Sequence, residues 1–451
     1  MSVRGNERLI DEYRNLHVKT NELARGGQGV VYRTTDENLA IKQPLNAEGQ
    51  LDVHANHSEL YRCIRALPLP KGVHISLPLA NLCNAPGYVM RLLKEMRPFS
   101  IFALDGEQRK KFENDPLPEW LSKVQDKKLA QELAYYAQTG STRFRLYALY
   151  KCAANLARLH NAGIVYGDVS ENNVFIGENA PCDCWLIDAD NLRLEQPHSG
   201  GRIIYTPRLG APELVQLKDS PRPRTDCWAF AVMAFQILSL CHPFIGKMVL
   251  ESENESGGWD SDPADQGGEA VDLDEQAYAG FLPYIDDEDD DSNEFNGGLP
   301  RQLILTSRLR TLFQETFGVG RLQPHRRPSM SFWALELARA FDNSIVCPSC
   351  KMSYYNSPDF ENCPYCGSSR PAFVIAKTDR WQMNLFDNNN KDSFKIFLPH
   401  RLFHPFSLAS SDFPEYEAQI NLSKKVEPQP VRGSKPFPLN LTFEIVNAEE
   451  K

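Results

Sequence analysis

Long hydrophobic runs are scarce in this chain of 451 residues. The most apolar run, Cys227 to Cys241, has about fifteen residues, many of them small, and is too short to cross a bilayer. The first twenty residues lack the charged-then-apolar pattern of a secretory signal. We therefore expect a soluble, cytoplasmic protein with no membrane association.

Positive charge is missing from one long stretch. Between Met248 and Pro300 there are 17 Asp and Glu residues and no Lys or Arg, whereas the rest of the chain carries 49 Lys and Arg against 42 Asp and Glu. The formal net charge of -10 is therefore local, and no basic stripe interleaved with aromatic residues indicates nucleic-acid binding. Because like charges at this density repel, we expect 248–300 to be a solvated, partly disordered insertion. Its apolar segment 277–284 is suited to dock back on the fold.

The sequence also lacks the pattern of a disulfide framework, because seven of its eleven cysteines are scattered. The other four, Cys347, Cys350, Cys363 and Cys366, form two Cys-x2-Cys turns separated by twelve residues. Two such turns can bring four thiolates onto one tetrahedral Zn²⁺. We predict a structural zinc site, rather than a redox pair, in a reducing compartment. Because Lys351 is the only cation between the two turns, a protein partner is expected in preference to nucleic acid.

Three glycines, Gly26, Gly27 and Gly29, lie between two strand-like segments. Glycine lets backbone N–H groups approach a phosphate closely, so the segment suggests a flap over a nucleotide, although for this motif alone a plain turn between strands is favoured. No Lys-Ser/Thr pair follows, which excludes a Walker loop. Lys42 then ends a short apolar strand, where its ammonium can neutralise phosphate. Glu59, near the start of the next helix, is a candidate partner for Lys42 or simply an acid that favours the helix N-terminus.

Asp168 and Asn173 stand five residues apart in a polar loop that follows a predicted core helix over 143–161. This spacing lets a carboxylate accept a hydroxyl proton while the carboxamide binds a phosphate-bridging metal, although both residues are also common in turns. The next apolar strand ends in Asp188 and Asp190. A carboxylate delivered beside a metal-binding Asn suits Mg²⁺, and the alternative is a solvated strand end. The pattern assigns no role to Asp190.

The order of these motifs resembles the eukaryotic-type protein kinase family over about residues 20–342. Thr206-Pro before Ala-Pro-Glu213, Asp226 at the start of a long apolar helix, and Arg327-Pro continue the series. The resemblance implies an α+β fold with the two lobes of a protein kinase. The predicted parts are a β-rich N-lobe over 20–93, a helical C-lobe over 94–342 with the acidic insertion 248–300, a segment resembling a zinc ribbon over 343–370, and a small β domain over 371–451.

The resemblance implies an ATP-dependent serine/threonine protein kinase that uses Mg²⁺ or Mn²⁺, with the C-terminal zinc-binding module recognising partners. Thr206 stands where serine/threonine-selective members of the family have a Thr that contacts the catalytic Asp, so the resemblance implies a contact with Asp168 and a Ser or Thr acceptor. Glu213 is expected to pair with Arg327. Lys42 is expected to pair with Glu59 and hold the phosphates, Asp168 to take the hydroxyl proton, and Asn173 and Asp188 to hold Mg²⁺. The residues expected to surround the nucleotide are Gly26, Gly27, Gly29, Val31, Ala40, Lys42, Glu59, Met90 and Leu92.

Several positions depart from the family pattern. Tyr166 and Gly167 replace the family's His-Arg, so phosphorylation of the activation segment lacks its usual arginine anchor. Ser170 replaces a phosphate-facing Lys, and Ala189-Asp190 replaces Phe-Gly. The departures keep open a pseudokinase scaffold that binds nucleotide or partners without phosphoryl transfer. A small-metabolite kinase is less favoured, because such enzymes lack the Ala-Pro-Glu segment and the late Arg-Pro.

The Gly-Asp-Val of the loop, the Ile-Asp-Ala-Asp after it and the zinc motif behind the lobe resemble a bacterial branch of serine/threonine kinases. Relatives of that branch occur in tellurite-resistance and stress-response gene clusters. The resemblance implies a protein substrate, with a von Willebrand A-type protein as a candidate, and a metal-dependent protein phosphatase as the counter-enzyme.

Overall fold

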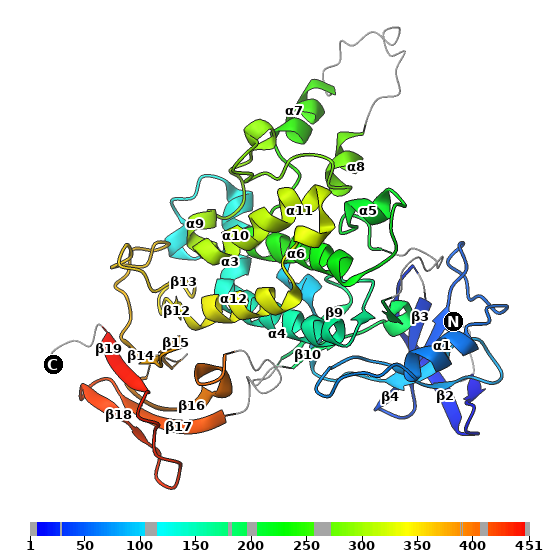
Figure 1. Ribbon diagram of the computed structural model, residues 1–451, viewed down its shortest axis with the longest axis horizontal. Coiled ribbons are helices and arrows are strands. Elements are labelled where there is room, and N and C mark those ends of the chain that lie inside the picture. Colours follow the sequence, from blue (N-terminus) through cyan, green and yellow to red (C-terminus); the bar gives the residue numbers. More distant parts are fainter. Residues whose placement is uncertain are drawn as a thin grey trace.

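A sheet-rich lobe is followed by a helical centre and a second β-rich part, an arrangement that fits a kinase-like fold. In Figure 1 the strands β2–β4 lie at one end of the long axis and β16–β18 at the other, with the helices between them. The computed structural model describes residues 7–27, 29–103, 115–178, 183–195, 205–256, 272–387, 389, 391–405 and 414–446.

The first lobe is built on a six-stranded antiparallel sheet of order β1-β2-β3-β4-β6-β5. Directly paired residues project from the same face, and the register pairs Lys42 with Val31 and Tyr88, and Ala40 with Met90. Four of the residues predicted around a nucleotide therefore share one face. The elements are β1 (Arg8–Ile10), β2 (Leu16–Arg25), β3 (Gly29–Thr34), β4 (Leu39–Pro44), α1 (Ser58–Arg65), β5 (Pro78–Asn81) and β6 (Tyr88–Arg91), so the sheet begins before residue 20.

The helical lobe packs around α4 (Ser141–Asn161), which includes the helix predicted over 143–161. Its neighbours α6 (Pro223–Ser239) and α12 (Met330–Asp342) bury Trp228 and Trp333. Over the ranges given above, no helix is both long and apolar enough to span a membrane. The other elements are β7 (Met96–Pro98), α3 (Lys127–Gln138), β8 (Ile164–Val165), β9 (Val174–Gly177), β10 (Cys184–Leu186), β11 (Arg193–Leu194), α5 (Pro212–Val215), α7 (Lys247–Ser256), α8 (Leu273–Tyr278), α9 (Arg301–Ile304), α10 (Ser307–Phe317), α11 (Val319–Leu322), and short 3-10 helices that include η3 (Ala189–Asn191).

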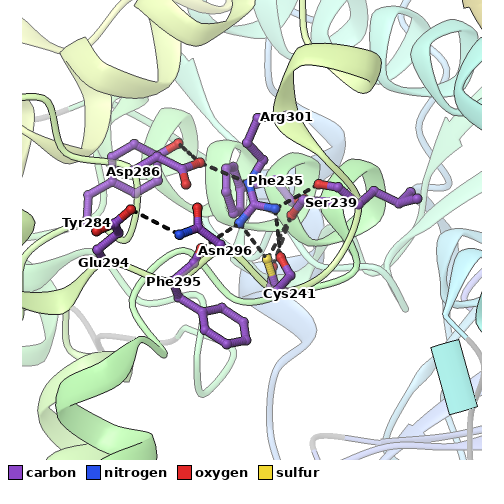
Figure 2. Close-up of polar contacts among 11 residues, drawn as sticks. Phe235, Ser239, Cys241, Tyr284, Asp286, Glu294, Phe295, Asn296 and Arg301 are labelled. Atoms are coloured by element: carbon purple, nitrogen blue, oxygen red, sulfur yellow. Dashed lines mark hydrogen bonds and ion pairs between the residues drawn. The ribbon is translucent and has the colours of Figure 1, made fainter. Parts of the chain in front are cut away.

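From residue 272 onward the acidic insertion folds back on the helical lobe, while Glu288, Asp289 and Asp290 of its acidic run stay exposed to solvent. Arg301 anchors it: Nε donates to Asp286 over 2.9 Å, Nη1 to the carbonyls of Gly297 and Leu299 over 2.8 Å, and the guanidinium covers Phe235 (Figure 2). One cation that follows the stretch thus holds its backbone and Asp286 against the lobe, while the next carboxylates of the run face solvent. The segment 277–284 docks as predicted, with Ala277, Leu282 and Tyr284 buried. Residues 257–271 lie outside the described residues.

The C-terminal part contains a hairpin and two three-stranded sheets, β15-β14-β19 and β16-β17-β18. The strands β14, β16 and β19 overlap the apolar runs 372–375, 394–398 and 441–446, whose pattern predicts a β domain. The elements are β12 (Ser344–Val346), β13 (Ser353–Tyr355), β14 (Phe373–Lys377), β15 (Gln382–Leu385), β16 (Ser393–Pro399), β17 (Pro414–Asn421), β18 (Val426–Pro430) and β19 (Thr442–Val446).

A buried charged junction ties this part to the helical lobe. Asp342, at the end of α12, accepts hydrogen bonds from Trp381 Nε1 over 2.8 Å and from Arg401 Nε and Nη2 over 2.8 and 2.7 Å. Arg143 of α4 donates to the carbonyls of Phe341 and Ser344 over 2.5 and 2.9 Å, and its guanidinium stacks on the Phe341 ring. The C-terminal part is therefore packed as a continuation of the helical lobe.

Candidate active site

Asp226, in the first turn of α6, fixes the backbone of the loop that precedes Asp168. Its two oxygens accept the backbone N–H groups of Tyr166 and Gly167, each over 2.9 Å. Nε2 of His160 lies 3.0 Å from Oδ2 of Asp226. Burial alone would lower the pKa of His160, but the hydrogen bond and charge of Asp226 outweigh burial and raise the pKa to about 9. His160 is thus a cation at neutral pH and completes an ion pair with Asp226.

Tyr166 and Gly167 have structural roles that sequence reasoning recorded as departures alone. The buried Tyr166 hydroxyl donates to the carbonyl of Ile187 and, over 3.3 Å, to that of Asn173, so it joins the loop of Asp168 and Asn173 to the strand that precedes Asp188. Gly167 has a φ of +84°, and a Cβ there would lie 3.2 Å from the carbonyl oxygen of Asn191. The sequence signal for both was the unusual residue type itself.

The carboxylate of Asp168 is held through both oxygens. Thr206 Oγ1 donates to Oδ1 over 2.7 Å, the contact predicted from the sequence, and Nδ2 of Asn173 donates to Oδ2 over 3.0 Å. Burial is the largest influence and raises the pKa of Asp168, although both hydrogen bonds act to lower it. A carboxylate oriented in this way can accept a proton from a hydroxyl group placed beside it.

Asn173 and Asp188 offer oxygen ligands at adjoining positions. The backbone N–H of Ile187 donates to the carbonyl of Asn173 over 2.9 Å, which brings the residue before Asp188 against the loop. Asn173 turns its amide nitrogen toward Asp168, so its side-chain oxygen is the atom suited to a metal. Asp188 takes a left-handed backbone conformation with φ of 55°, which Asp adopts more readily than most residues. Two hard oxygen donors with few further protein ligands fit the preferences of Mg²⁺.

The predicted ion pair between Lys42 and Glu59 is not formed. The Lys42 ammonium contacts Asp188 and lies 2.8 Å from Oδ2 of Asp190, whereas Glu59 is 82% exposed and 3.6 Å from Arg62. Burial would lower the pKa of Lys42, but the charges of Asp188 and Asp190 outweigh it and raise the pKa. Asp190, to which the sequence pattern assigned nothing, is therefore part of the site.

The glycine-rich segment makes a tight turn above Lys42. The N–H of Gly26 donates to the carbonyl of Gly29 over 2.9 Å, and a Cβ on Gly29 would lie 3.0 Å from Cε of Lys42. Glycine at this position lets the turn approach the lysine. Val31 and Ala40 lie on the sheet face shared with Lys42, next to Met90, and the N–H of Leu92 donates to Asn38 over 2.8 Å. The roles of Gly27, Val31, Ala40, Met90 and Leu92 toward a nucleotide stay predictions.

Glu213 and Arg327 form the predicted ion pair. Both guanidinium Nη atoms donate to the carboxylate, over 2.7 and 2.8 Å, and Arg327 is 1% exposed. The guanidinium also lies over the ring of Trp228. Two parallel bonds fix both position and orientation, so the pair braces α5 against the segment before α12.

The four predicted zinc ligands converge. The sulfur atoms of Cys347, Cys350, Cys363 and Cys366 all lie within 4.8 Å of one another, and two of the S–S distances are 3.6 Å. A tetrahedral site with Zn–S bonds of about 2.3 Å places its sulfurs about 3.8 Å apart. The cluster therefore fits a closed zinc site with four thiolate ligands, in both ligand type and spacing.

No protein-family model matches the chain. The chain is 30% identical over 105 residues to mitogen-activated protein kinase hog1 of Aspergillus terreus. The matched region covers 23% of this chain and 28% of that relative. It is also 30% identical over 107 residues to serine/threonine-protein kinase pkn2 of Myxococcus xanthus, which covers 22% of this chain and 13% of that protein. The chain thus spans about a quarter or less of the relatives that it matches. These distant similarities support a protein-kinase family for this chain.

Proposed function

We propose that this protein transfers the γ-phosphate of ATP to a serine or threonine hydroxyl of a protein, with Mg²⁺ or Mn²⁺ as the metal. The arrangement of Asp168 carries the proposal: Thr206 and Asn173 each bond one of its oxygens, and Lys42 and Asp188 lie in the adjoining cluster. This is the set of groups that phosphoryl transfer requires for a proton acceptor, a metal and a phosphate-binding cation.

Each side chain has a separate task in the proposed reaction. Asp168 orients the acceptor hydroxyl and takes its proton, and the bond from Thr206 keeps the carboxylate directed toward a Ser or Thr acceptor. Lys42 neutralises phosphate charge. Asp188 and the side-chain oxygen of Asn173 would hold the metal, which neutralises charge on the phosphates when it is bound. Because Ser170 supplies no cation, the stabilisation of the transferring group depends more heavily on the metal.

The test is transfer of labelled phosphate from ATP to protein by the purified full-length chain with Mg²⁺ or Mn²⁺. Asp168→Asn preserves the size of the side chain but removes the proton acceptor, so the rate should fall by about 100-fold or more. Asp289→Asn, which removes an exposed carboxylate from the same lobe, should leave the rate unchanged. Equal labelling by the wild type and by Asp168→Asn would rule out the proposed reaction.

A nucleotide-binding scaffold is the second candidate, and the engagement of Lys42 by two carboxylates favours it. The scaffold predicts a rise in melting temperature with ATP and Mg²⁺, because a ligand that binds the folded state stabilises it, without any transfer of phosphate. Transfer that disappears in Asp168→Asn would exclude the scaffold as the sole function.

We also propose that the C-terminal part, the zinc-binding module together with the β domain behind it, recognises protein partners, with the von Willebrand A-type protein and the phosphatase implied by the sequence resemblance as candidates. Phe397 on β16 and Val426 on β18 support this role, since they expose 60% and 50% of their surface. Phe397→Asp should slow phosphorylation of a protein substrate at least several-fold and leave phosphorylation of a short peptide unchanged. An equal effect on both substrates would argue against partner recognition at this position.

A further inference from the structure

Asp190 is fixed through both of its carboxylate oxygens. Oδ2 lies 2.8 Å from Nζ of Lys42, and Oδ1 accepts a hydrogen bond of 2.9 Å from the hydroxyl of Tyr88. The side chains of Lys42 and Asp190 are 8% and 15% exposed, and Tyr88 is buried. Asp190 also lies on the short helix η3, next to the strand that delivers Asp188. A largely shielded carboxylate with two partners is held in one orientation.

Asp188 contacts the same ammonium but is suited to a different task. Its side chain is 21% exposed, more than that of Asp190, and it adjoins the metal-ligand candidate Asn173. A carboxylate whose oxygens bind a divalent cation has less negative charge available for a neighbouring ammonium. Asp190 has no second task of this kind, so it can hold Lys42 whether or not Asp188 binds a metal.

Glu59 lies on the wrong face of α1 to replace Asp190. The helix buries Tyr61 and Ile64, and the Tyr61 ring packs edge-on against Tyr88 with centroids 4.6 Å apart. Glu59 precedes Tyr61 by two residues, about 200° around the helix, which explains its exposure. A rigid-body approach of α1 would therefore bring Tyr61 toward Lys42 instead of Glu59.

A cavity of about 1030 Å³ borders the same cluster. Lys42 and Asp190 line it on one side, and Leu60 and Ile64 of α1 line it on another. The space gives α1 room to rotate or shift. Because a movement of α1 could also carry Glu59 to a new position, a substitution of Glu59 is the control that distinguishes Glu59 from Asp190 as the partner of Lys42.

We propose that Asp190, braced by Tyr88, is the positioning residue that directs the Lys42 ammonium at the phosphates of the nucleotide, in the place expected for Glu59. The inference rests on the proposed function, because it requires that the site binds a nucleotide. If Asp190 acts by positioning Lys42, its substitution should affect the binding of ligands that carry phosphate and of no others. ATP presents phosphates to Lys42, whereas adenosine presents none, so the loss of Asp190 should weaken binding of ATP alone.

The experiment measures dissociation constants for ATP with Mg²⁺ and for adenosine by isothermal calorimetry on the full-length protein. Asp190→Asn should weaken ATP binding at least ten-fold, as expected for one charge-assisted hydrogen bond, and change adenosine binding less than two-fold. Tyr88→Phe should act in the same direction with a smaller effect. Glu59→Gln should leave both constants within two-fold of the wild type.

A double-mutant cycle with Lys42→Met then tests whether Asp190 acts through the lysine. Asp190→Asn added to Lys42→Met should cause no further loss of ATP affinity. The inference is overturned if Asp190→Asn leaves ATP binding unchanged, if it weakens adenosine binding equally, or if its effect adds to that of Lys42→Met. A wild type that binds ATP but transfers no phosphate would instead contradict the proposed reaction and leave the binding test intact, and a wild type that binds neither ligand would overturn both.

Discussion

Two buried groups of charges in this molecule have opposite compositions. At the junction with the C-terminal part, Arg401 binds the carboxylate of Asp342, and the charge of Asp342 also acts on Arg143. At the candidate site, Asp188 and Asp190 surround one ammonium, Lys42. Within the part of the chain that the structure describes, these side chains give the first group more positive than negative charge and the second more negative than positive charge.

The two groups differ in how the excess charge is compensated. At the junction the protein does so itself, because Arg143 donates to backbone carbonyls and stacks on the Phe341 ring. At the site Tyr88 bonds Asp190, while among the described residues Asp188 is bonded to Lys42 alone. An internally compensated group is suited to hold structure, and one with a partly exposed carboxylate in excess is suited to bind a cation from outside.

Loss of the predicted zinc site, which lies beside the junction, should lower the melting temperature more than any other change considered. Structural zinc sites contribute on the order of 10 kcal/mol to folding, and the hairpin that carries Cys347 packs on α4 through a 2.7 Å bond from Arg143 to Ser353. Cys363→Ser should lower the melting temperature by roughly 10 °C or more and abolish bound zinc. Cys83→Ser, at an exposed cysteine, is the matched control. A zinc-free protein with an unchanged melting temperature would show that the cluster is not structural.

Asp342→Asn should be the next most damaging change. It removes the charge of the carboxylate that pairs with the buried Arg401, and loss of one partner from a buried ion pair typically costs about 3–5 kcal/mol. Urea unfolding of the variant should show this loss, while Asp379→Asn, an exposed neighbour, should stay within about 0.5 kcal/mol of the wild type. If Asp342→Asn were as stable as Asp379→Asn, the junction would not be a structural ion-pair group, and its contrast with the candidate site would fail.

Asp188→Asn, in contrast, should reduce phosphoryl transfer far more than it reduces the free energy of unfolding. It removes one of two carboxylates around a single ammonium, so the free energy of unfolding should change by less than about 1 kcal/mol or increase. Asn retains the tolerance for the left-handed backbone at this position. Phosphoryl transfer should nevertheless be lost, because a metal ligand is gone. A large loss of stability in urea unfolding would mean that the site is a structural ion-pair group.

The ion pair of His160 and Asp226 should give a smaller effect that depends on pH. The pKa of His160 is raised to about 9, above its value near 6.5 in an unfolded chain. The pair therefore contributes its full stability below about pH 6.5 and loses it as pH rises through about 9. The difference in melting temperature between wild type and His160→Gln should be largest at pH 6 and should shrink by pH 10. A difference that grows with pH would contradict this assignment.

The contacts that sequence reasoning predicted correctly involve residues with fixed separations and few geometric alternatives. Thr206 reaches Asp168, Glu213 reaches Arg327, and the four cysteines converge, because each pair of motifs has one way to meet in this fold. The helix over 143–161 followed from apolar residues at helical spacing. Ligand type and periodicity are local properties, so a single sequence records them.

The predictions that failed depended on rotation and long-range packing. Whether Glu59 faces Lys42 depends on how α1 is rotated about its own axis. That rotation is set by the packing of Tyr61 against Tyr88 of β6. The composition of the acidic stretch also does not reveal that Arg301 binds Asp286 and holds the stretch against the lobe. In both cases the deciding contact depends on tertiary packing, which local composition does not record.

Gly167 also limits how control of this protein can change through evolution. An arginine at this position, which in the kinases that the chain resembles anchors a phosphorylated activation segment, would require a side chain at φ of +84° and a Cβ 3.2 Å from the carbonyl oxygen of Asn191. A single substitution therefore meets strain before it can bring any regulatory gain. Dependence on activation-segment phosphorylation is not one mutation away from this chain, and descendants that acquired it would first have to remodel the contact with Asn191.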